Sequence, residues 1–426
     1  MRRGFLNGGQ TKQRCLADPG APPDSAGATV KKSVSSGTGS TNSKPIHVPH
    51  DTQHDDNSFL VTTQPSQMQG TSLAEVPGGW TECILTGKAK RMLLATPGFP
   101  QPVPSPTHPN CYRIANSPGK GLGVFANRDI RTGDLIIAER PITIAPAFGS
   151  VSLQGNSNDP AVREAHQKME GRLEAVFARV PPENQQAYLA LANCHLHDGS
   201  GKLTGIQRTN GFEVKGLGEG PYSGVFKDIS RINHSCSPNT IRHWDPASLS
   251  LRLRAVRDIA KDEEITVHYV TIITMAQERA KELAPYQIKC SCPACANSLV
   301  SDTNRVDILL KQYINGPEMD KAFKQWCPDR DAPDDRVLNV ALRELALLDS
   351  EGLQLHPGYG TLLSLALRCY IALGDEDKVL EFGQRAGRSF MAEKDGDRSL
   401  LDNHSSLDLV KKNKLWGIRR RMSKQA

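Results

Sequence analysis

The sequence lacks a long apolar run, a secretory signal and a strong excess of charge of one sign. None of its hydrophobic stretches approaches the length of a membrane span. Residues 1–6 lack the apolar core of a secretory signal, although their basic residues leave a mitochondrial presequence open as an alternative. The 52 Lys and Arg nearly balance the 46 Asp and Glu, so the net charge of +6 does not argue for nucleic-acid binding. We expect an intracellular protein of the nucleus, the cytoplasm or both, without membrane contact or direct nucleic-acid binding.

A disulfide framework is also disfavoured. Of the ten cysteines, three are crowded into Cys290–Cys295 as Cys-x-Cys-x-x-Cys. Such crowding suits metal ligation in a reducing compartment better than cross-linking. Three thiolates at this spacing can reach one tetrahedral ion, but zinc takes four ligands, so another residue must supply the fourth. Free buried thiols are the alternative. Cys194, His195 and His197 are not expected to bind metal, because they end a predicted helix and have no partners there.

Composition and hydrophobic period divide the chain into six segments. The first is poor in apolar residues and rich in Ser, Thr, Gly, Pro, Gln and Asn, so it cannot bury enough surface to offset its conformational entropy. An inert tail is favoured there over a docking arm. The predicted segments are a disordered tail (1–75), short strands at 80–85 and 91–94 with a Pro-rich connector (76–110), a β-rich domain (111–270) with a helical insert at about 155–200, a cysteine segment (271–297), a helical domain (298–395) and a basic tail (396–426).

A glycine-rich stretch, Gly119-Lys120-Gly121-Leu122-Gly123, lies between two β-rich runs. Glycine allows a tight loop whose backbone can approach a ligand closely. An ordinary hairpin is the alternative. The spacing is not Gly-x-Gly-x-x-Gly, and no βαβ unit surrounds it, so a dinucleotide-binding fold is disfavoured.

Three polar motifs follow one another in the second half of the β-rich domain. Arg231–Thr240 reads Arg-Ile-Asn-His-Ser-Cys-Ser-Pro-Asn-Thr, which is too polar for a core strand, and Pro238 excludes a helix interior. Glu263–Tyr269 reads Glu-Glu-Ile-Thr-Val-His-Tyr, and Cys290–Cys295 comes next. In this order and spacing the motifs resemble those of SET-domain protein lysine methyltransferases, over roughly residues 82–296.

The resemblance implies an α+β fold. Its parts are a SET-type β-fold with a threaded (pseudoknot) loop, a helical insert, a zinc-bound post-SET segment and an all-α C-terminal domain. The turn at Gly374-Asp375 and the Leu, Ala and Tyr spacing around it are similar to tetratricopeptide hairpins. The helical C-terminal region resembles that of SET and MYND domain methyltransferases. Because no Cys/His-rich finger lies in the insert, the overall layout is also similar to fungal SET proteins that lack the MYND finger.

The implied activity is methyl transfer from S-adenosylmethionine to a lysine of a histone tail or of another protein. Tyr269 would orient the lysine amine at the floor of a channel. Carried over to this sequence, the cofactor-binding residues are Lys120, Gly121, Leu122, Asn233, His234 and Tyr286, the channel residues are Phe212 and Tyr222, and the zinc ligands are Cys236, Cys290, Cys292 and Cys295.

Two residues depart from the family pattern. His268 stands before the tyrosine, where Asp or Ser is usual, and Ile288 stands where an aromatic residue commonly stacks on adenine. Tyr286 is expected to replace that aromatic residue, and a low affinity for the cofactor is the alternative. The alternative function is a catalytically silent interaction scaffold. A nucleic-acid-binding zinc protein is a third possibility, but no basic helix or aromatic platform accompanies the cysteines.

Overall fold

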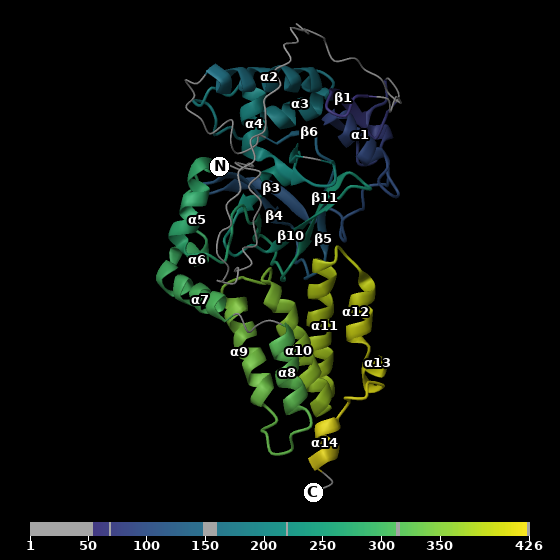
Figure 1. Ribbon diagram of the computed structural model, residues 1–426, viewed down its shortest axis with the longest axis vertical. Coiled ribbons are helices and arrows are strands. Elements are labelled where there is room, and N and C mark those ends of the chain that lie inside the picture. The colour runs from purple at the N-terminus through teal and green to yellow at the C-terminus, as the bar shows by residue number, and fades with distance from the viewer. Residues whose placement is uncertain (1–53, 68–69, 148–159, 219, 312–315, 424–426) are drawn as a thin grey trace, which may run out of the picture.

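The computed structural model describes residues 54–67, 70–147, 160–218, 220–311 and 316–423 (Figure 1). The small sheets lie in the middle of the molecule, between helices of the insert at one end and the C-terminal helices at the other. Helices α5, α6 and α7 run along one side and lead from the sheets to the C-terminal helices. Among the described residues, none of the helices combines the length and the apolar character needed to cross a bilayer.

The strands form three sheets, with the orders β1-β2-β6-β8-β7, β10-β11-β5 and β3-β4-β12-β9. Most neighbours are antiparallel, whereas β2–β6 and β12–β9 are parallel pairs. The strands are β1 (Phe59–Gln64), β2 (Thr81–Thr86), β3 (Tyr112–Ser117), β4 (Gly121–Ala126), β5 (Leu135–Glu139), β6 (Thr143–Pro146), β7 (Phe212–Val214), β8 (Tyr222–Val225), β9 (Asn233–His234), β10 (Thr240–Asp245), β11 (Ser250–Ala255) and β12 (Glu264–Val267).

The helices fall into three groups that match their places in Figure 1. The first group covers the five-stranded sheet, the second carries the cysteine segment, and the third forms the C-terminal region. They are α1 (Gly87–Leu94), α2 (Pro160–Phe177), α3 (Pro182–Leu189) and α4 (Lys202–Asn210); α5 (Ala276–Leu283), α6 (Pro293–Ala296) and α7 (Ser298–Leu310); and α8 (Gly316–Trp326), α9 (Arg336–Ser350), α10 (Pro357–Leu373), α11 (Glu376–Glu393), α12 (Arg398–Ser405), α13 (Leu407–Lys411) and α14 (Ile418–Ser423). Short 3-10 turns are η1 (Leu73–Glu75), η2 (Ile229–Arg231) and η3 (Ala284–Tyr286).

The end of the predicted disordered tail is wrong, because residues 59–64 form strand β1. The strand pairs along its whole length with β2, and Val61, Thr62 and Gln64 are buried. Composition gave no sign of this, since the apolar surface that covers β1 comes from β2 and from α2. Residues 73–75 of the predicted tail also form the short turn η1, whereas residues 1–53 and 68–69 lie outside the described residues.

The type of one element and the end of another also differ from the prediction. Residues 91–94 were expected to be a strand but end helix α1, whose first turn is capped by the Thr86 hydroxyl accepting from the backbone of Ala89. A threonine cap of this kind stabilises a helix start and makes the short apolar run helical. The helical insert also extends past residue 200, because α4 adds another buried helix.

The third sheet brings the glycine-rich stretch and two of the polar motifs together. Asn233 and His234 of β9 lie beside Thr266 and Val267 of β12, and β12 pairs on its other side with β4. Fully buried apolar side chains fix this arrangement, among them Val124, Ile232, Ile265 and Val267. Motifs that are far apart in the sequence therefore become neighbouring strands. The threading of the loop itself stays a prediction.

The C-terminal helices pack around a continuous apolar core. The predicted helix, sharp turn and helix are present as α10 and α11, with Gly374 in the left-handed conformation and Asp375 capping α11. Their similarity to tetratricopeptide repeats stays a prediction. Residues 396–423 are not simply a basic tail, because Arg419 is buried and donates to the carbonyl oxygens of Trp326 (2.6 Å) and Ala332 (2.6 Å).

Candidate functional site

Tyr269 follows strand β12 and lies at the meeting point of the motifs. Its hydroxyl donates to the carbonyl oxygen of Ile232 at 2.5 Å, and its backbone N–H donates to His234 Nδ1 at 3.0 Å. Its ring centroid lies 5.3 Å from that of His234 and 6.2 Å from that of Tyr286. The side chain is half-buried. The hydroxyl is therefore held at a defined place inside an aromatic surrounding.

His234 is a structural link rather than a free base. The Nδ1 atom accepts from Tyr269, so in the neutral ring Nε2 carries the proton, and Nε2 lies 3.2 Å from Cys236 Sγ. Burial is the main cause that lowers the pKa of His234 to about 3. Both ring nitrogens are engaged, which leaves the ring face and the backbone of His234 for contact with a ligand.

A charged and amide cluster lies beside this link. Glu264 accepts from Asn233 Nδ2 at 2.6 Å and from Lys120 Nζ at 2.8 Å, and Asn233 Nδ2 also donates to the carbonyl oxygen of Leu122 at 3.2 Å. Gly121 begins β4 with a φ of +73°, where glycine is favoured. The glycine-rich stretch is thus the turn of the β3–β4 hairpin, and it still places Lys120 and Leu122 next to Asn233. Glu264 was not predicted as a site residue, although it stands in the quoted Glu-Glu-Ile-Thr motif.

The structure gathers Cys236, Cys290, Cys292 and Cys295, and their sulfur atoms all lie within 4.8 Å of one another. Cys236 Sγ is 3.9 Å from Cys290 Sγ and 3.6 Å from Cys295 Sγ. Four sulfurs at tetrahedral zinc, with Zn–S distances of about 2.3 Å, lie roughly 3.8 Å apart. Both the donor chemistry and the spacing of these thiols therefore fit zinc.

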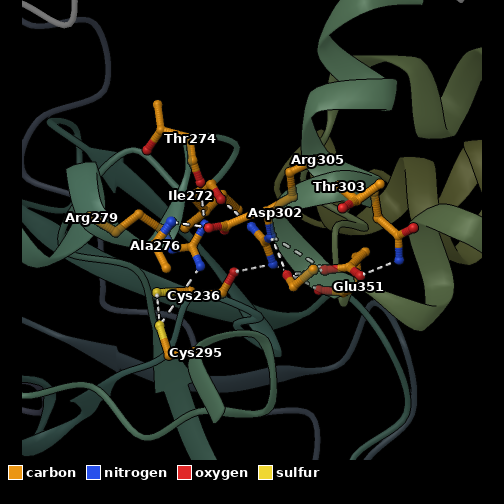
Figure 2. Close-up of polar contacts among 12 residues, drawn as sticks. Cys236, Ile272, Thr274, Ala276, Arg279, Cys295, Asp302, Thr303, Arg305 and Glu351 are labelled. Atoms are coloured by element: carbon orange, nitrogen blue, oxygen red, sulfur yellow. Dashed lines mark hydrogen bonds and ion pairs between the residues drawn. The ribbon is translucent and has the colours of Figure 1, made fainter. Parts of the chain in front are cut away.

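The four thiols differ in how readily they take the anionic form that zinc requires, because hydrogen bonds with the neighbouring thiols raise the pKa of Cys236 and the pKa of Cys290 is raised as well. Hydrogen bonds from Cys236 and Cys290 lower the pKa of Cys295 to about 6, and hydrogen bonds among the same thiols lower the pKa of Cys292 further. Figure 2 shows Arg279 pointing at this cluster, with Nη2 donating to Cys295 Sγ at 3.7 Å.

The two predicted channel residues lie in different places. Phe212 packs in the apolar cluster that also contacts Tyr269. Tyr222 does not reach the site, because it lies in the five-stranded sheet with Leu85 and its hydroxyl accepts from the backbone of Thr86 at 3.1 Å. Its place beside Tyr269 is therefore not supported: β8 turns this ring toward α1, and the sequence does not reveal which way the strand faces.

Arg242 is a site residue that the sequence did not single out. Its guanidinium lies 5.5 Å from the centroid of the Phe212 ring, in a half-buried position on β10. Within the described ranges this guanidinium has no hydrogen bond or ion pair. Burial, followed by the positive charge of Arg242, lowers the pKa of His268 to about 4, so His268 is neutral at neutral pH. The signal for Arg242 that the sequence offered was its position, three residues after Asn239 of the polar motif.

Ile288 lies away from Tyr269. With Leu283, Ala284 and Gln287 it lines an open cavity of about 540 Å³, which also borders Cys290 and Cys295. Tyr269 is not among the residues that line this cavity. Tyr286, two residues earlier, is the aromatic residue that faces the site.

The segment with Cys194 and His195 has partners that the sequence did not reveal. His195 Nδ1 lies 2.7 Å from Asp198, which also accepts from Arg208 at 2.7 Å. Within the ranges that the structure describes, the four cysteines above are the one group with metal-ligand geometry. His195 is therefore part of a local ion-pair cluster in the insert.

Comparisons with known proteins agree with the motifs. Residues 121–270 match the family model described as SET domain. The chain is 30% identical over 196 residues to histone-lysine N-methyltransferase set5 of Schizosaccharomyces pombe, covering 45% of this chain and 52% of that protein. It is 40% identical over 73 residues to human histone-lysine N-methyltransferase SMYD3, covering 17% of each. The predicted resemblance to SET-domain lysine methyltransferases is confirmed.

These similarities have a limited extent. The chain spans about half the length of the fission-yeast relative and about a quarter of mouse histone-lysine N-methyltransferase Smyd1, to which it is 26% identical over 29% of this chain. Among solved structures, the Neurospora SET domain protein DIM-5, a histone lysine methyltransferase, is 18% identical and covers 38% of this chain and 52% of its own, with a TM-score of 0.18. That superposition is too poor to carry an argument.

Proposed function

We propose that this chain, whose residues 121–270 match the SET domain, is a protein-lysine N-methyltransferase that uses S-adenosylmethionine. The observation that carries the proposal is the position of Tyr269. Its ring lies near the rings of His234 and Tyr286, its hydroxyl is fixed by the Ile232 carbonyl, and Asn233 of the Asn233–Glu264–Lys120 cluster precedes His234 in β9. A histone tail and a lysine of another protein are both substrates to test, in the nucleus or the cytoplasm.

The residues present suit the cofactor chemically. Lys120 and the Asn233 amide would meet its carboxylate and amino groups, the backbone of Gly121, Leu122 and His234 offers donors and acceptors, and the Tyr286 ring provides an apolar face. When bound, the cofactor supplies an electrophilic methyl group, so the chain mainly has to align a nucleophile with it.

The chain's own task is to present a neutral lysine amine. An exposed lysine has a pKa near 10.4, and its protonated form cannot attack. A lysine amine that entered beside Phe212 and Tyr269, which pack in one apolar cluster, would lose water, and the Arg242 guanidinium would add a like charge nearby. Both effects lower the pKa of the amine. The Tyr269 hydroxyl would then orient the amine by a hydrogen bond, without acting as a base.

We also propose that Cys236, Cys290, Cys292 and Cys295 hold zinc. Cys236 belongs to the loop after β9, whereas the other three belong to the post-SET segment around α6. An ion bound by all four would fix this segment against the loop, and its binding free energy would contribute to folding of the site. We further propose that the C-terminal helices form tetratricopeptide-like hairpins. These helices would provide a protein-binding surface.

The test uses purified zinc-replete protein, with calorimetric titration of S-adenosylmethionine and transfer of labelled methyl groups to core histones and to a cytosolic protein fraction. We expect wild type to bind the cofactor and label a lysine. Tyr269→Phe should bind the cofactor with similar affinity but label at least about 100-fold more slowly, because only the hydroxyl is lost. Absence of cofactor binding by folded, zinc-loaded wild type would overturn the enzyme and favour the catalytically silent scaffold.

A further inference from the structure

Two arginines are completely buried against the cysteine cluster. Arg279 of α5 and Arg305 of α7 each have a relative exposure of 0%. Figure 2 shows their guanidinium groups on the same side of Cys236 and Cys295. Buried charges are costly unless they are paired and hydrogen-bonded, so the partners of each guanidinium indicate what it does.

The partners of Arg279 lie on both sides of the guanidinium. One nitrogen, Nη1, donates to the carbonyl oxygen of Thr274 and lies 3.7 Å from the Asp302 carboxylate, while Nη2 donates to Cys295 Sγ. Asp302 also accepts from the backbone of Ala276 at 2.8 Å, which holds the carboxylate at the start of α5. Burial alone would lower the pKa of Arg279, but the bond to Cys295 and the charge of the thiolates raise it.

Arg305 connects the cluster to the C-terminal helices. Its Nη2 donates to the carbonyl oxygens of Cys236 and Glu351, both at 3.2 Å, and its Nε lies 3.3 Å from the Glu351 carboxylate. Glu351 also accepts from Ser301 and Asn304. Burial, followed by the positive charge of Arg279, lowers the pKa of Arg305. The two guanidiniums are thus close enough to repel each other.

A tetrathiolate zinc centre would give this arrangement an electrostatic purpose. Four thiolates outweigh the two positive charges of zinc by two, and this excess would be only partly exposed to water, since Cys236 and Cys292 are buried and Cys290 and Cys295 are half-buried. The carboxylates of Asp302 and Glu351 hold the far edges of the two guanidiniums, so that an N–H of Arg279 faces the sulfur of Cys295 and an N–H of Arg305 faces the backbone of Cys236.

We infer that Arg279 and Arg305 are positioning residues that stabilise the anionic zinc–cysteine centre, and that Glu351 links this centre to the C-terminal helices. The inference rests on the zinc site proposed above but not on methyl transfer. Groups that orient and neutralise metal ligands from outside the ligand set commonly contribute about 10- to 100-fold to metal affinity. The sequence gives no sign of this arrangement, because Arg279 belongs to α5, Arg305 to α7 and Glu351 to the C-terminal cap of α9.

The experiment measures zinc affinity of the full chain by competition with a chromophoric chelator, and the absorption spectrum after Co²⁺ replaces zinc. We expect Arg279→Gln to weaken zinc binding about 10- to 100-fold, and its sulfur-to-cobalt charge-transfer band to move to longer wavelength because the thiolates lose a positive neighbour. Arg279→Lys should recover most of the affinity. Arg305→Gln and Glu351→Gln should weaken binding in the same direction.

Arg419→Gln is the matched control, since Arg419 is a buried arginine that donates to backbone carbonyls far from any cysteine of the cluster. It should lower the melting temperature and leave zinc affinity unchanged. Equal zinc affinity in wild type and folded Arg279→Gln overturns the inference, and so does an equal loss in Arg419→Gln. If Arg279→Gln does not fold, the comparison passes to Arg305→Gln and Arg279→Lys. A wild type that binds no zinc overturns the site and the inference together, whereas loss of methyl transfer alone affects neither.

Discussion

Gly123 tests whether the Asn233–Glu264–Lys120 cluster has to keep its geometry. Gly123 lies in β4 directly under this cluster. A methyl group built on it would lie 2.6 Å from Glu264 Oε1 and 2.9 Å from Asn233 Nδ2. Such atoms normally pack at roughly 3.5 Å, so Gly123→Ala must displace the carboxylate and the amide by about an ångström. The displacement would break the 2.6 Å bond between them.

The expected magnitude follows from these contacts. Forcing one methyl group into a packed site costs about 1–3 kcal/mol, which corresponds to a roughly 5- to 150-fold change in an equilibrium constant. If Asn233 and Lys120 bind S-adenosylmethionine, we expect Gly123→Ala to weaken its binding by about 10- to 100-fold. The assay is calorimetric titration, accompanied by a thermal melt that shows whether the variant is folded.

Gly171→Ala is the control for adding a methyl group to the same domain. Gly171 lies in α2 with no atom within 4 Å of the added carbon, so this change should leave cofactor binding unaltered and raise stability by up to about 1 kcal/mol. Wild-type cofactor affinity in a folded Gly123→Ala variant would refute the reasoning, because the cluster would then be dispensable for the cofactor.

Three further predictions concern the remaining parts of the structure. His268 has a folded-state pKa of about 4, below its ordinary 6.5, so between these pH values the folded state binds fewer protons than the unfolded state and loses stability as the pH falls. Urea melts at pH 7 and pH 4.5 should show the wild type losing up to about 3 kcal/mol more stability than His268→Asn. Equal losses in the two proteins would contradict the lowered pKa of His268. In the proposed function the Arg242 guanidinium lies beside the amine of the substrate lysine, and removing this cation raises the pKa of the amine. Arg242→Met should therefore move the rising limb of the pH–rate profile of methyl transfer about 1 unit to higher pH. An unchanged profile would place Arg242 outside the proposed lysine channel. A chain that begins at residue 76 lacks β1 and its buried Val61, and should be at least about 2 kcal/mol less stable than one that begins at residue 54; equal melting curves would show that β1 adds nothing.

The site could be predicted to the extent that its chemistry is local in sequence. Asn233, His234 and Cys236 are close along the chain, and the Cys290–Cys295 spacing is itself a ligand pattern, so their gathering followed from the motifs. Tyr222 shows the limit. A strand residue faces one side or the other according to the neighbours its strand pairs with, and the register of β8 with β6 and β7 is not written in its own residues.

The same physical reason explains the errors in the fold. Strand β1 consists of residues that read as part of a polar tail, and it becomes ordered because β2 offers a free edge and the turn after α2 supplies Arg179, which contacts Thr63 and Glu82. Long-range partners of this kind override local composition. Where a local device exists, as with Asp375 capping α11 after Gly374, the prediction and the structure agree.

The imidazole of His234 connects the cysteine cluster to Tyr269. Its Nε2–H faces the Cys236 sulfur, and its Nδ1 receives the backbone N–H of Tyr269. A sulfur held as thiolate by zinc accepts the Nε2–H bond more strongly than a neutral thiol does, which fixes the ring tautomer that Tyr269 needs. The Tyr269 hydroxyl is anchored in turn on Ile232, two residues before His234. The geometry of the hydroxyl therefore depends on the state of a sulfur that it does not touch, so zinc bound by the four cysteines is expected to influence the orientation of the Tyr269 hydroxyl.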